Sequence, residues 1–268
     1  MHASPVVPPT ARDRRLLRYG VRVPLLVLHI LIAPLLAVVV ALLPTHSARD
    51  AGHEPQAHRI VRWWSARLLR IFGMQVRRAG EPLADPVLLV ANHVSWLDIE
   101  LLHTQRAACF VAKAEIAGWP LVGWLAARAG TLFHRRGSNH SLGAVMAVMV
   151  ERLRQGRAVA VFPEGGIDHA SGTYRVRTFH ARIFQAGIDA GVPVQPVALA
   201  YRRDGALWDD ATFRPGESFL GNFLRLLGES GLQAEVTFLA PVVASGDGRR
   251  RLAEAARDTI ATHLEQHP

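Results

Sequence analysis

Six short apolar runs, each followed by a stretch able to form a helix or a turn, dominate the sequence from residue 86 to residue 243. They read PVLLVANH, ACFVAK, GTLFHRR, RAVAVFPEG, VPVQPVALAY and AEVTFLAPVV. Most lack the polar alternation of a strand with one face in water, so both faces should be covered. Helices at 139 to 155 and 179 to 190 fit between the runs. The pattern predicts an α/β fold with a mixed, largely parallel sheet flanked by helices.

The length of 268 residues suits one α/β domain with a smaller appendage. We expect the domain at residues 84–268, ending in a surface helix over RRRLAEAARDTIATHLEQ. One of its strands carries Pro193 and Pro196. Because proline donates no ladder hydrogen bond, this strand is predicted to be an edge strand or an irregular one.

An apolar run without formal charge occupies residues 24 to 43, within an N-terminal part placed at residues 1–50. About 20 residues suffice for a helix to cross a bilayer core. Five arginines precede the run and favour a cytoplasmic N-terminus: Arg12, Arg14, Arg15, Arg18 and Arg22. A cleaved signal peptide is disfavoured, because the run is too long and no A-x-A site follows. Pro34 permits a re-entrant bend, so spanning and re-entrant placements both stay open.

The segment that follows, assigned to residues 51–83, is predicted to hold an amphipathic helix over residues 58 to 78. At 100° per residue one face collects Val61, Trp64, Leu68 and Phe72, and arginines gather opposite. Such a helix suits the headgroup region of a membrane. The alternative is a helix that covers the soluble core. With the preceding run, it would form an N-terminal membrane-associated helical pair.

Charge and cysteine content limit the possible partners and cofactors. The formal charge of +9 comes almost wholly from arginine, since Lys113 is the only lysine. This surface should attract phosphates of lipids, nucleic acid or a substrate. No nucleic-acid reader module is recognisable, so we expect no nucleic-acid partner. A single cysteine, Cys109, excludes an internal disulfide, and the absence of H-E-x-x-H or a Cys-His cluster predicts no metal and no cofactor.

His93 and Asp98 are the first candidates for catalysis. They follow the first strand, where open α/β sheets present ligand sites. A histidine takes a proton near neutral pH, and a nearby carboxylate can hold its tautomer. Five residues apart on a helix they would diverge, so contact requires the pair to straddle a strand-to-helix turn. Ser95 lies between them without a G-x-S-x-G elbow, and a helix cap is the expected role.

Two other strand ends carry groups that could take part in binding. Arg135 and Arg136 follow one strand, and their guanidinium groups would suit a phosphate. Glu164 and Gly165 follow another, where the glycine allows a close approach of the backbone. Each pattern alone is weak, because arginine pairs usually face solvent and Pro-Glu-Gly is usually a turn.

Taken in order, four motifs are specific. The chain has N-H-x4-D at 92 to 98, F-x-x-R at 133 to 136, F-P-E-G at 162 to 165 and V-P-V-x-P at 192 to 196. This set resembles the glycerolipid acyltransferase family, the 1-acylglycerol-3-phosphate acyltransferases and their relatives. The resemblance covers residues 84 to 200. The N-terminal helices are similar to the membrane-docking pair of bacterial members.

The resemblance implies transfer of a fatty acyl chain from acyl-CoA or acyl carrier protein to a lysolipid hydroxyl. His93 would be the general base and Asp98 would orient it. The first expectation is 1-acylglycerol-3-phosphate as acceptor, giving phosphatidic acid. The enzyme would work at a membrane surface, on the cytoplasmic face of a bacterial-type inner membrane.

The resemblance also implies substrate-binding residues. Arg136 matches the arginine that holds the acceptor phosphate, with Arg135 as support. Glu164 and Gly165 match the acceptor-binding motif, and Lys113 could assist an anionic group.

Departures from the family pattern leave the acceptor open. Gly166, Ile167 and Asp168 stand where hydroxyl residues are common, and His134 with Arg135 replaces an apolar-acidic pair. The segment FHARIFQAGIDAGVPVQPVALAY looks most like lyso-ornithine lipid acyltransferases, whose acceptor has no phosphate. Lyso-ornithine lipid is therefore the alternative acceptor. A non-catalytic membrane lipid-binding protein is the alternative of another class.

Overall fold

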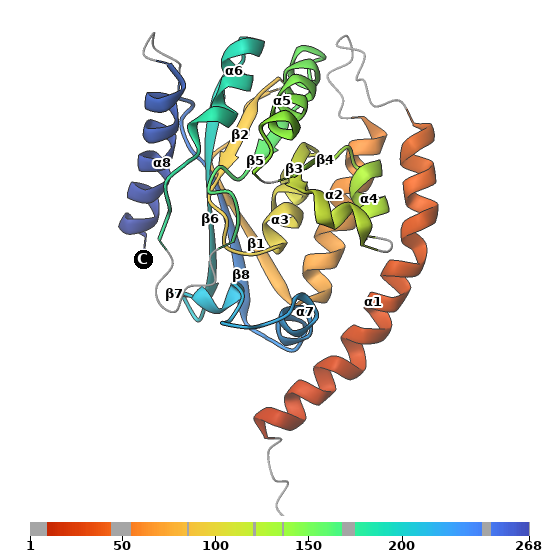
Figure 1. Ribbon diagram of the computed structural model, residues 1–268. Coiled ribbons are helices and arrows are strands. Elements are labelled where there is room, and N and C mark those ends of the chain that lie inside the picture. The colour runs from red at the N-terminus through yellow and green to blue at the C-terminus, as the bar shows by residue number, and fades with distance from the viewer. Residues whose placement is uncertain are drawn as a thin grey trace, which may run out of the picture.

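A central twisted sheet organises the molecule (Figure 1). The computed structural model describes residues 10–43, 55–84, 86–119, 122–135, 137–167, 175–242 and 248–267. The strand order is β1-β8-β6-β2-β5-β3-β4, and the short β7 pairs with β6. The strands are β1 (Met74–Ala79), β2 (Leu88–Ala91), β3 (Cys109–Lys113), β4 (Leu132–His134), β5 (Val159–Val161), β6 (Val194–Arg203), β7 (Ala206–Leu207) and β8 (Leu232–Phe238).

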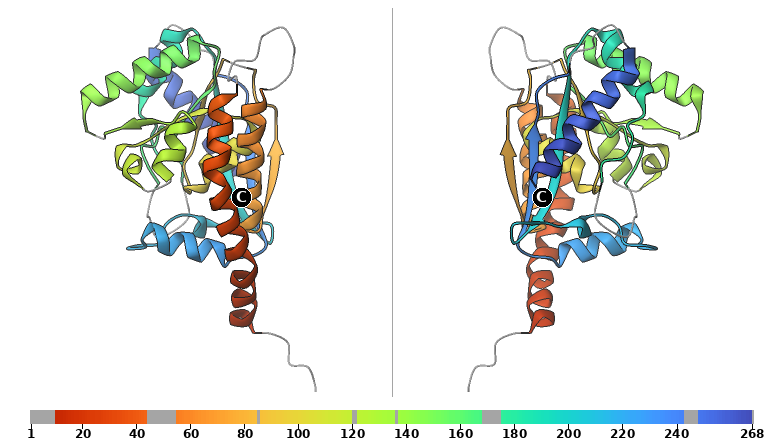
Figure 2. Two further views of the ribbon diagram at one scale, coloured as in Figure 1. Left: turned by 90° about the vertical axis from the view of Figure 1, so that its right-hand side faces the viewer. Right: turned by 90° about the vertical axis from the view of Figure 1, so that its left-hand side faces the viewer.

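Helices cover both faces of this sheet. Buried side chains of α2, α3 and α7 join the core on one face, and those of α5, α6 and α8 join the core on the other. The longest helix, α1, lies beside α2 (Figures 1 and 2). The helices are α1 (Ala11–Leu42), α2 (Gln56–Ile71), α3 (Leu97–Gln105), α4 (Val122–Arg128), α5 (Asn139–Arg154), α6 (Gln185–Ala190), α7 (Phe219–Leu227) and α8 (Gly248–Gln266), with 3-10 turns at Ala114–Gly118, Ala181–Phe184 and Asp209–Ala211.

The predicted fold class is confirmed. Strands β2 to β6 form parallel pairs, and β8 pairs antiparallel with β6 and parallel with β1. All four residues of β2 are buried, as the continuous apolar run predicted. Burying a side chain such as Leu88 or Leu89 stabilises the fold by about 1.5 to 3 kcal/mol. Since β2, β5, β3 and β4 are parallel neighbours, their carboxyl ends share one edge of the sheet.

The proline-containing strand was predicted to be an edge strand or an irregular one, and the first of these alternatives is wrong. β6 is central, between β2 and β8. Pro196 is tolerated because the ladder between β6 and β8 stops beside it, at the pair Val197 and Phe238. The Gln195 side chain instead donates to the carbonyl of Leu239, at 3.2 Å. The strand is thus interior and locally irregular.

The predicted helix over residues 58 to 78 is too long. α2 ends at Ile71, and Gly73, at φ 74°, reverses the backbone into β1. Of the predicted apolar face, Phe72 is fully buried and Leu68 packs against the core, and Ser65 and Leu69 are buried beside them. α2 packs between α1 and α3, as expected for a helix that covers the core.

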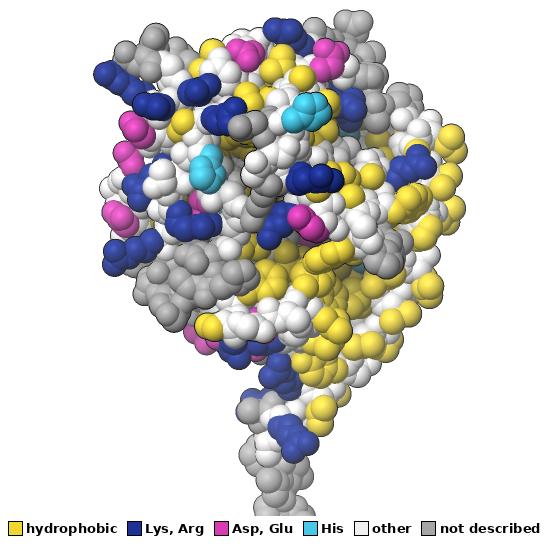
Figure 3. All heavy atoms as spheres, in the orientation of Figure 1, with side chains coloured by type: hydrophobic (Ala, Val, Ile, Leu, Met, Phe, Trp, Pro, Cys, Tyr) yellow, Lys and Arg dark blue, Asp and Glu magenta, His cyan; other side chains and the backbone are white. Residues whose placement is uncertain are grey.

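α1 runs without interruption through Pro24 and Pro34, so the chain does not turn back at Pro34. Its segment Arg12–Leu42 is long and apolar enough to cross a membrane, and an 18-residue stretch within it has a mean hydropathy of 2.9. A stripe including Leu26 and Ala33 is buried. The remaining apolar surface is exposed and appears as the yellow band in Figure 3; it includes Leu16, Leu17, Val21, Leu28, Leu31, Leu35 and Leu42.

The amino-terminal part of α1 is held by the end of α7. Arg18 Nε donates to the carbonyl of Gly228 at 2.6 Å, and Arg22 Nη1 donates to that of Leu227 at 2.8 Å. The Tyr19 hydroxyl donates to a third carbonyl one turn earlier, at 2.8 Å. Helix ends leave carbonyls without partners and favour cations there. The arginines predicted to set membrane orientation therefore also fasten α1 to the domain.

Candidate active site

His93 and Asp98 meet in the turn between β2 and α3. His93 Nδ1 lies 2.8 Å from Asp98 Oδ2. The His93 side chain is 13% exposed and that of Asp98 is 0% exposed. The five-residue spacing works because His93 precedes the helix, which begins at Leu97, whereas Asp98 lies in its first turn. The chain therefore straddles the strand-to-helix turn, as the spacing required.

Four donors surround the Asp98 carboxylate. Besides His93, Oδ2 accepts from the backbone amides of Val94, at 2.7 Å, and Ser95, at 2.9 Å. Oδ1 accepts from the Tyr201 hydroxyl at 2.7 Å. Burial, together with the charge of Asp98, raises the pKa of Tyr201 well above its ordinary value, so this hydroxyl stays a donor. The carboxylate thus fixes the turn and the imidazole together.

This contact determines the tautomer of His93. A carboxylate only accepts hydrogen bonds, so the neutral ring carries its proton on Nδ1 and leaves the lone pair of Nε2 available. The ring stacks on Phe162, with centroids 4.0 Å apart and planes at 11°. The arrangement gives an oriented imidazole that can accept a proton at Nε2.

The neighbours of His93 support the same turn. The Asn92 side chain exchanges two 2.8 Å hydrogen bonds with the backbone of Leu199 and extends the sheet beyond the end of β2. Ser95 is buried, and its hydroxyl accepts from the amide of Leu97 at 3.4 Å. Ser95 therefore supports the first turn of α3, although the cap residue itself is Trp96.

Glu164 follows β5, the neighbour of β2, and is bonded within the protein. Its side chain is 0% exposed. Oε1 accepts from the backbone amide of His93 at 3.2 Å, and Oε2 accepts from Arg177 Nε at 3.1 Å. Arg177 also donates to the carbonyl of Gly166. Glu164 therefore links the ends of β2 and β5 directly behind the imidazole.

Gly165 lies at φ 77°, a conformation that L side chains rarely adopt. A Cβ atom there would also lie 3.0 Å from His180 Nε2. The glycine of the F-P-E-G motif is thus required by its own turn, whatever it binds.

The predicted basic residues lie farther along the same edge. Lys113 ends β3 and Arg135 directly follows β4, and both are exposed. With strands about 4.8 Å apart, β4 is roughly 14 Å from β2. The Arg135 amide donates to Ser141 Oγ at 2.9 Å, which anchors the loop on α5. Arg136 lies outside the described residues.

Three contributors to the site were missed in the sequence. Tyr201 closes the apolar run VPVQPVALAY, where its hydroxyl alone hinted at a polar partner. Phe162 stands inside F-P-E-G, where it looked like a strand residue. No sequence signal identified Arg177, because its contact with Glu164 joins residues that no local pattern relates. Within the described ranges, no three His, Cys, Asp or Glu side chains are grouped as a metal ion would need.

Comparison with known proteins identifies the family. The Acyltransferase family model matches residues 73–200. A lyso-ornithine lipid O-acyltransferase of Pseudomonas aeruginosa is 42% identical over 211 residues, 78% of this chain and 80% of that protein. A 1-acyl-sn-glycerol-3-phosphate acyltransferase of Neisseria gonorrhoeae is 38% identical over 129 residues, 48% of this chain and 49% of that protein. The chain belongs to the acyltransferase family.

A solved structure supports the fold. The crystal structure of the 1-acyl-sn-glycerophosphate acyltransferase PlsC from Thermotoga maritima matches with a TM-score of 0.65 and 19% identity, over 96% of this chain and 97% of that one. The family match and the identity with the Pseudomonas relative make the protein a lysolipid acyltransferase. The turn bearing His93 and Asp98 lies at the carboxyl edge of its sheet.

Replacing Tyr201 with Phe tests the support of Asp98. Loss of one hydrogen bond to a charged group costs about 1.5 kcal/mol, so we expect kcat to fall about ten-fold with little change in KM. Steady-state kinetics on the purified variant measures this. Tyr19→Phe is the matched control, because it removes a hydroxyl that bonds a carbonyl of α7 instead. An unchanged kcat in Tyr201→Phe would exclude a role for this bond in catalysis.

Proposed function

We propose that the protein transfers a fatty acyl chain from acyl-CoA or acyl carrier protein to the free hydroxyl of a lyso-ornithine lipid. The observation that carries this proposal is the 42% identity with a lyso-ornithine lipid O-acyltransferase over 78% of the chain. The acceptor first expected from the motifs, 1-acylglycerol-3-phosphate, becomes the second candidate. It is supported by the shorter match to the Neisseria enzyme and by the arginines that follow β4.

In the proposed mechanism His93 is the general base. Its Nε2 takes the proton of the acceptor hydroxyl as the oxygen attacks the thioester carbonyl. The C–O bond forms, the C–S bond breaks, and the leaving thiolate takes the proton back from the imidazolium. Asp98 holds the ring and stabilises its charged form. General-base assistance of this kind is worth about 10²- to 10⁴-fold in rate.

The environment of Asp98 limits where an oxyanion could be stabilised. The amides of Val94 and Ser95 already donate to Asp98. They are therefore unsuited to donate to the developing oxyanion, whose donors must come from elsewhere in the complex.

Glu164 has a positioning role in this mechanism. Its carboxylate already accepts from the His93 amide and from Arg177, so contact with the acceptor is not needed to explain the motif. A buried carboxylate with charged and neutral donors fixes the backbone of His93 relative to the end of β5. Arg177 neutralises the buried charge.

The proposed partner of α1 is the membrane. Its exposed leucines lie along a helix that is fastened to α7 and packed on α2, so the helix can rest in the bilayer surface while the site stays at that surface. With the N-terminal arginines in the cytoplasm, the active site would face the cytoplasmic side of the inner membrane.

An acceptor panel tests the proposed function. Purified full-length protein receives a labelled acyl thioester and either lyso-ornithine lipid or 1-acylglycerol-3-phosphate in mixed vesicles. We expect kcat/KM to be at least about ten-fold higher for lyso-ornithine lipid, a preference of about 1.4 kcal/mol. His93→Ala should lower kcat for either acceptor by about 10²- to 10⁴-fold. A preference for 1-acylglycerol-3-phosphate would refute this acceptor assignment and favour the second candidate.

Membrane contact by α1 is tested by placing a charged side chain on its exposed apolar face. Leu31, which is 70% exposed, is changed to Asp, and binding to anionic vesicles is measured by co-sedimentation. Placing a carboxylate in the lipid costs about 2 to 3 kcal/mol, so binding should fall more than ten-fold. Val148→Asp is the control, since Val148 is exposed on α5, on the other side of the sheet. Equal binding by both variants would rule out docking through this face.

A further inference from the structure

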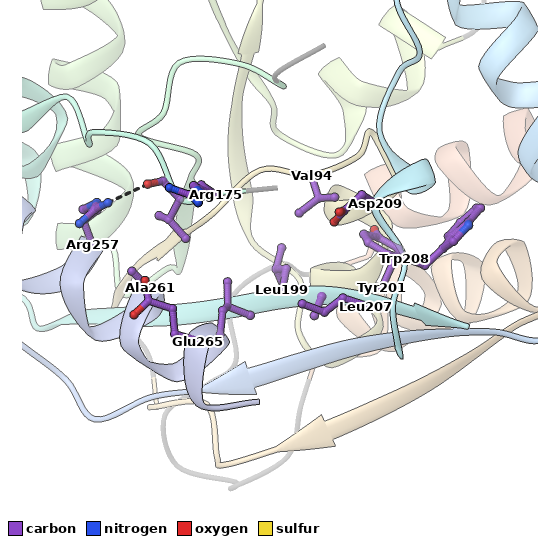
Figure 4. Close-up of a pocket in the computed structure, with 13 residues that line it drawn as sticks. Val94, Arg175, Leu199, Tyr201, Leu207, Trp208, Asp209, Arg257, Ala261 and Glu265 are labelled. Atoms are coloured by element: carbon purple, nitrogen blue, oxygen red, sulfur yellow. Dashed lines mark hydrogen bonds between the residues drawn. The ribbon is translucent and has the colours of Figure 1, made fainter. Parts of the chain in front are cut away.

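A cavity of about 460 Å³ opens beside the catalytic turn, on the side away from β4. β2 ends at Ala91, opposite Val197, whereas β6 continues to Arg203. The cavity lies against this free part of β6, with α8 on one side and the turn after β7 on the other (Figure 4). Its lining includes Leu199 and Tyr201.

Two lining residues connect the cavity to the catalytic pair. Val94 follows His93 and donates its amide to Asp98. Tyr201 donates its hydroxyl to the other oxygen of the same carboxylate. A group bound in the cavity would therefore lie against the turn that carries the base.

The charged residues of the cavity are of both signs. Arg175 and Arg257 line it, and so do Asp209 and Glu265. In Figure 4 the two arginines and Glu265 lie toward one side and Asp209 toward the other, with Leu199 between them. Arg257 is fixed at the wall by a 3.0 Å hydrogen bond to the carbonyl of Val176. A phosphate alone would leave Asp209 without a role, whereas a ligand with both charges would use the arginines at one end and Asp209 at the other.

We propose that this cavity binds the zwitterionic headgroup of the acceptor. This assignment rests on the proposed function. Ornithine in amide linkage keeps one carboxylate and one ammonium group, separated by four carbon atoms. Arg175 and Arg257 bind the carboxylate, and Asp209, on the opposite side of the cavity, binds the ammonium.

The placement of charge across the cavity fits such a headgroup. Arg257 belongs to α8 on one side, and Asp209 belongs to the turn after β7 on the other. The acceptor would then extend from the cavity past Val94 to present its hydroxyl to His93.

The test pairs variants with altered acceptors. The acceptors are lyso-ornithine lipid, its carboxylate methyl ester and its N-acetylated form, which each lack one charge. The parent enzyme should show a KM about ten-fold higher for either altered acceptor. Arg257→Gln should raise the KM for lyso-ornithine lipid about ten-fold and no longer discriminate against the ester. Asp209→Asn should no longer discriminate against the N-acetylated form. The KM for the thioester should stay unchanged in both.

Controls separate binding from folding. Because Arg257 also holds the Val176 carbonyl, Arg175→Gln is a second variant and should likewise lose discrimination against the ester. Arg250→Gln and Glu254→Gln are exposed on α8, do not line the cavity and should behave as the parent. Thermal unfolding checks that every variant is folded.

Two outcomes refute the headgroup site while leaving the proposed function intact: full discrimination by the Arg257, Arg175 and Asp209 variants, or a rise in the KM for the thioester instead. The second would assign the cavity to the donor. A parent enzyme that does not acylate lyso-ornithine lipid refutes the proposed function, and the headgroup assignment with it.

Discussion

The buried carboxylate of Asp98 is the group on which the geometry of the candidate active site depends. It is fully buried and accepts from the imidazole of His93, two consecutive backbone amides and the hydroxyl of Tyr201. A buried charge is tolerated only when its hydrogen-bonding capacity is met, and here the donors come from β6 and from the turn itself. One ionised group therefore fixes the shape of the turn, the orientation of the imidazole and its tautomer.

The rest of the fold places this turn. Parallel pairing brings the ends of β2 and β5 side by side, so that Glu164 can reach the amide of His93. The longer β6 supplies Tyr201 and leaves a cavity beside the turn. α1 is tied through Arg18 and Arg22 to the end of α7, whose Asn222 accepts from the indole of Trp96. The apolar helix is therefore connected, through α7, to the turn that carries His93 and Asp98.

Much of this arrangement could be predicted from the sequence, because it follows from local patterns. The six apolar runs became six strands of the sheet, and N-H-x4-D was correctly predicted to straddle a turn. The end of α2 was missed although Gly73 signalled it, since the amphipathic pattern continued for several residues. The central position of β6 was missed because only the tertiary structure shows that its ladder is interrupted beside Pro196. The pairing of Arg177 with Glu164 was missed for the same reason, because it is a tertiary contact that no local pattern indicates.

The most direct test of the central claim is a double-mutant cycle on kcat with His93→Ala, Asp98→Asn and the double variant, each shown to be folded by thermal unfolding. Residues that act as one unit are non-additive. If Asp98 acts through His93, both single variants lose activity and the double variant is no slower than His93→Ala alone. An Asp98→Asn enzyme with the parent's kcat, or losses that simply multiply in the double variant, would contradict the account.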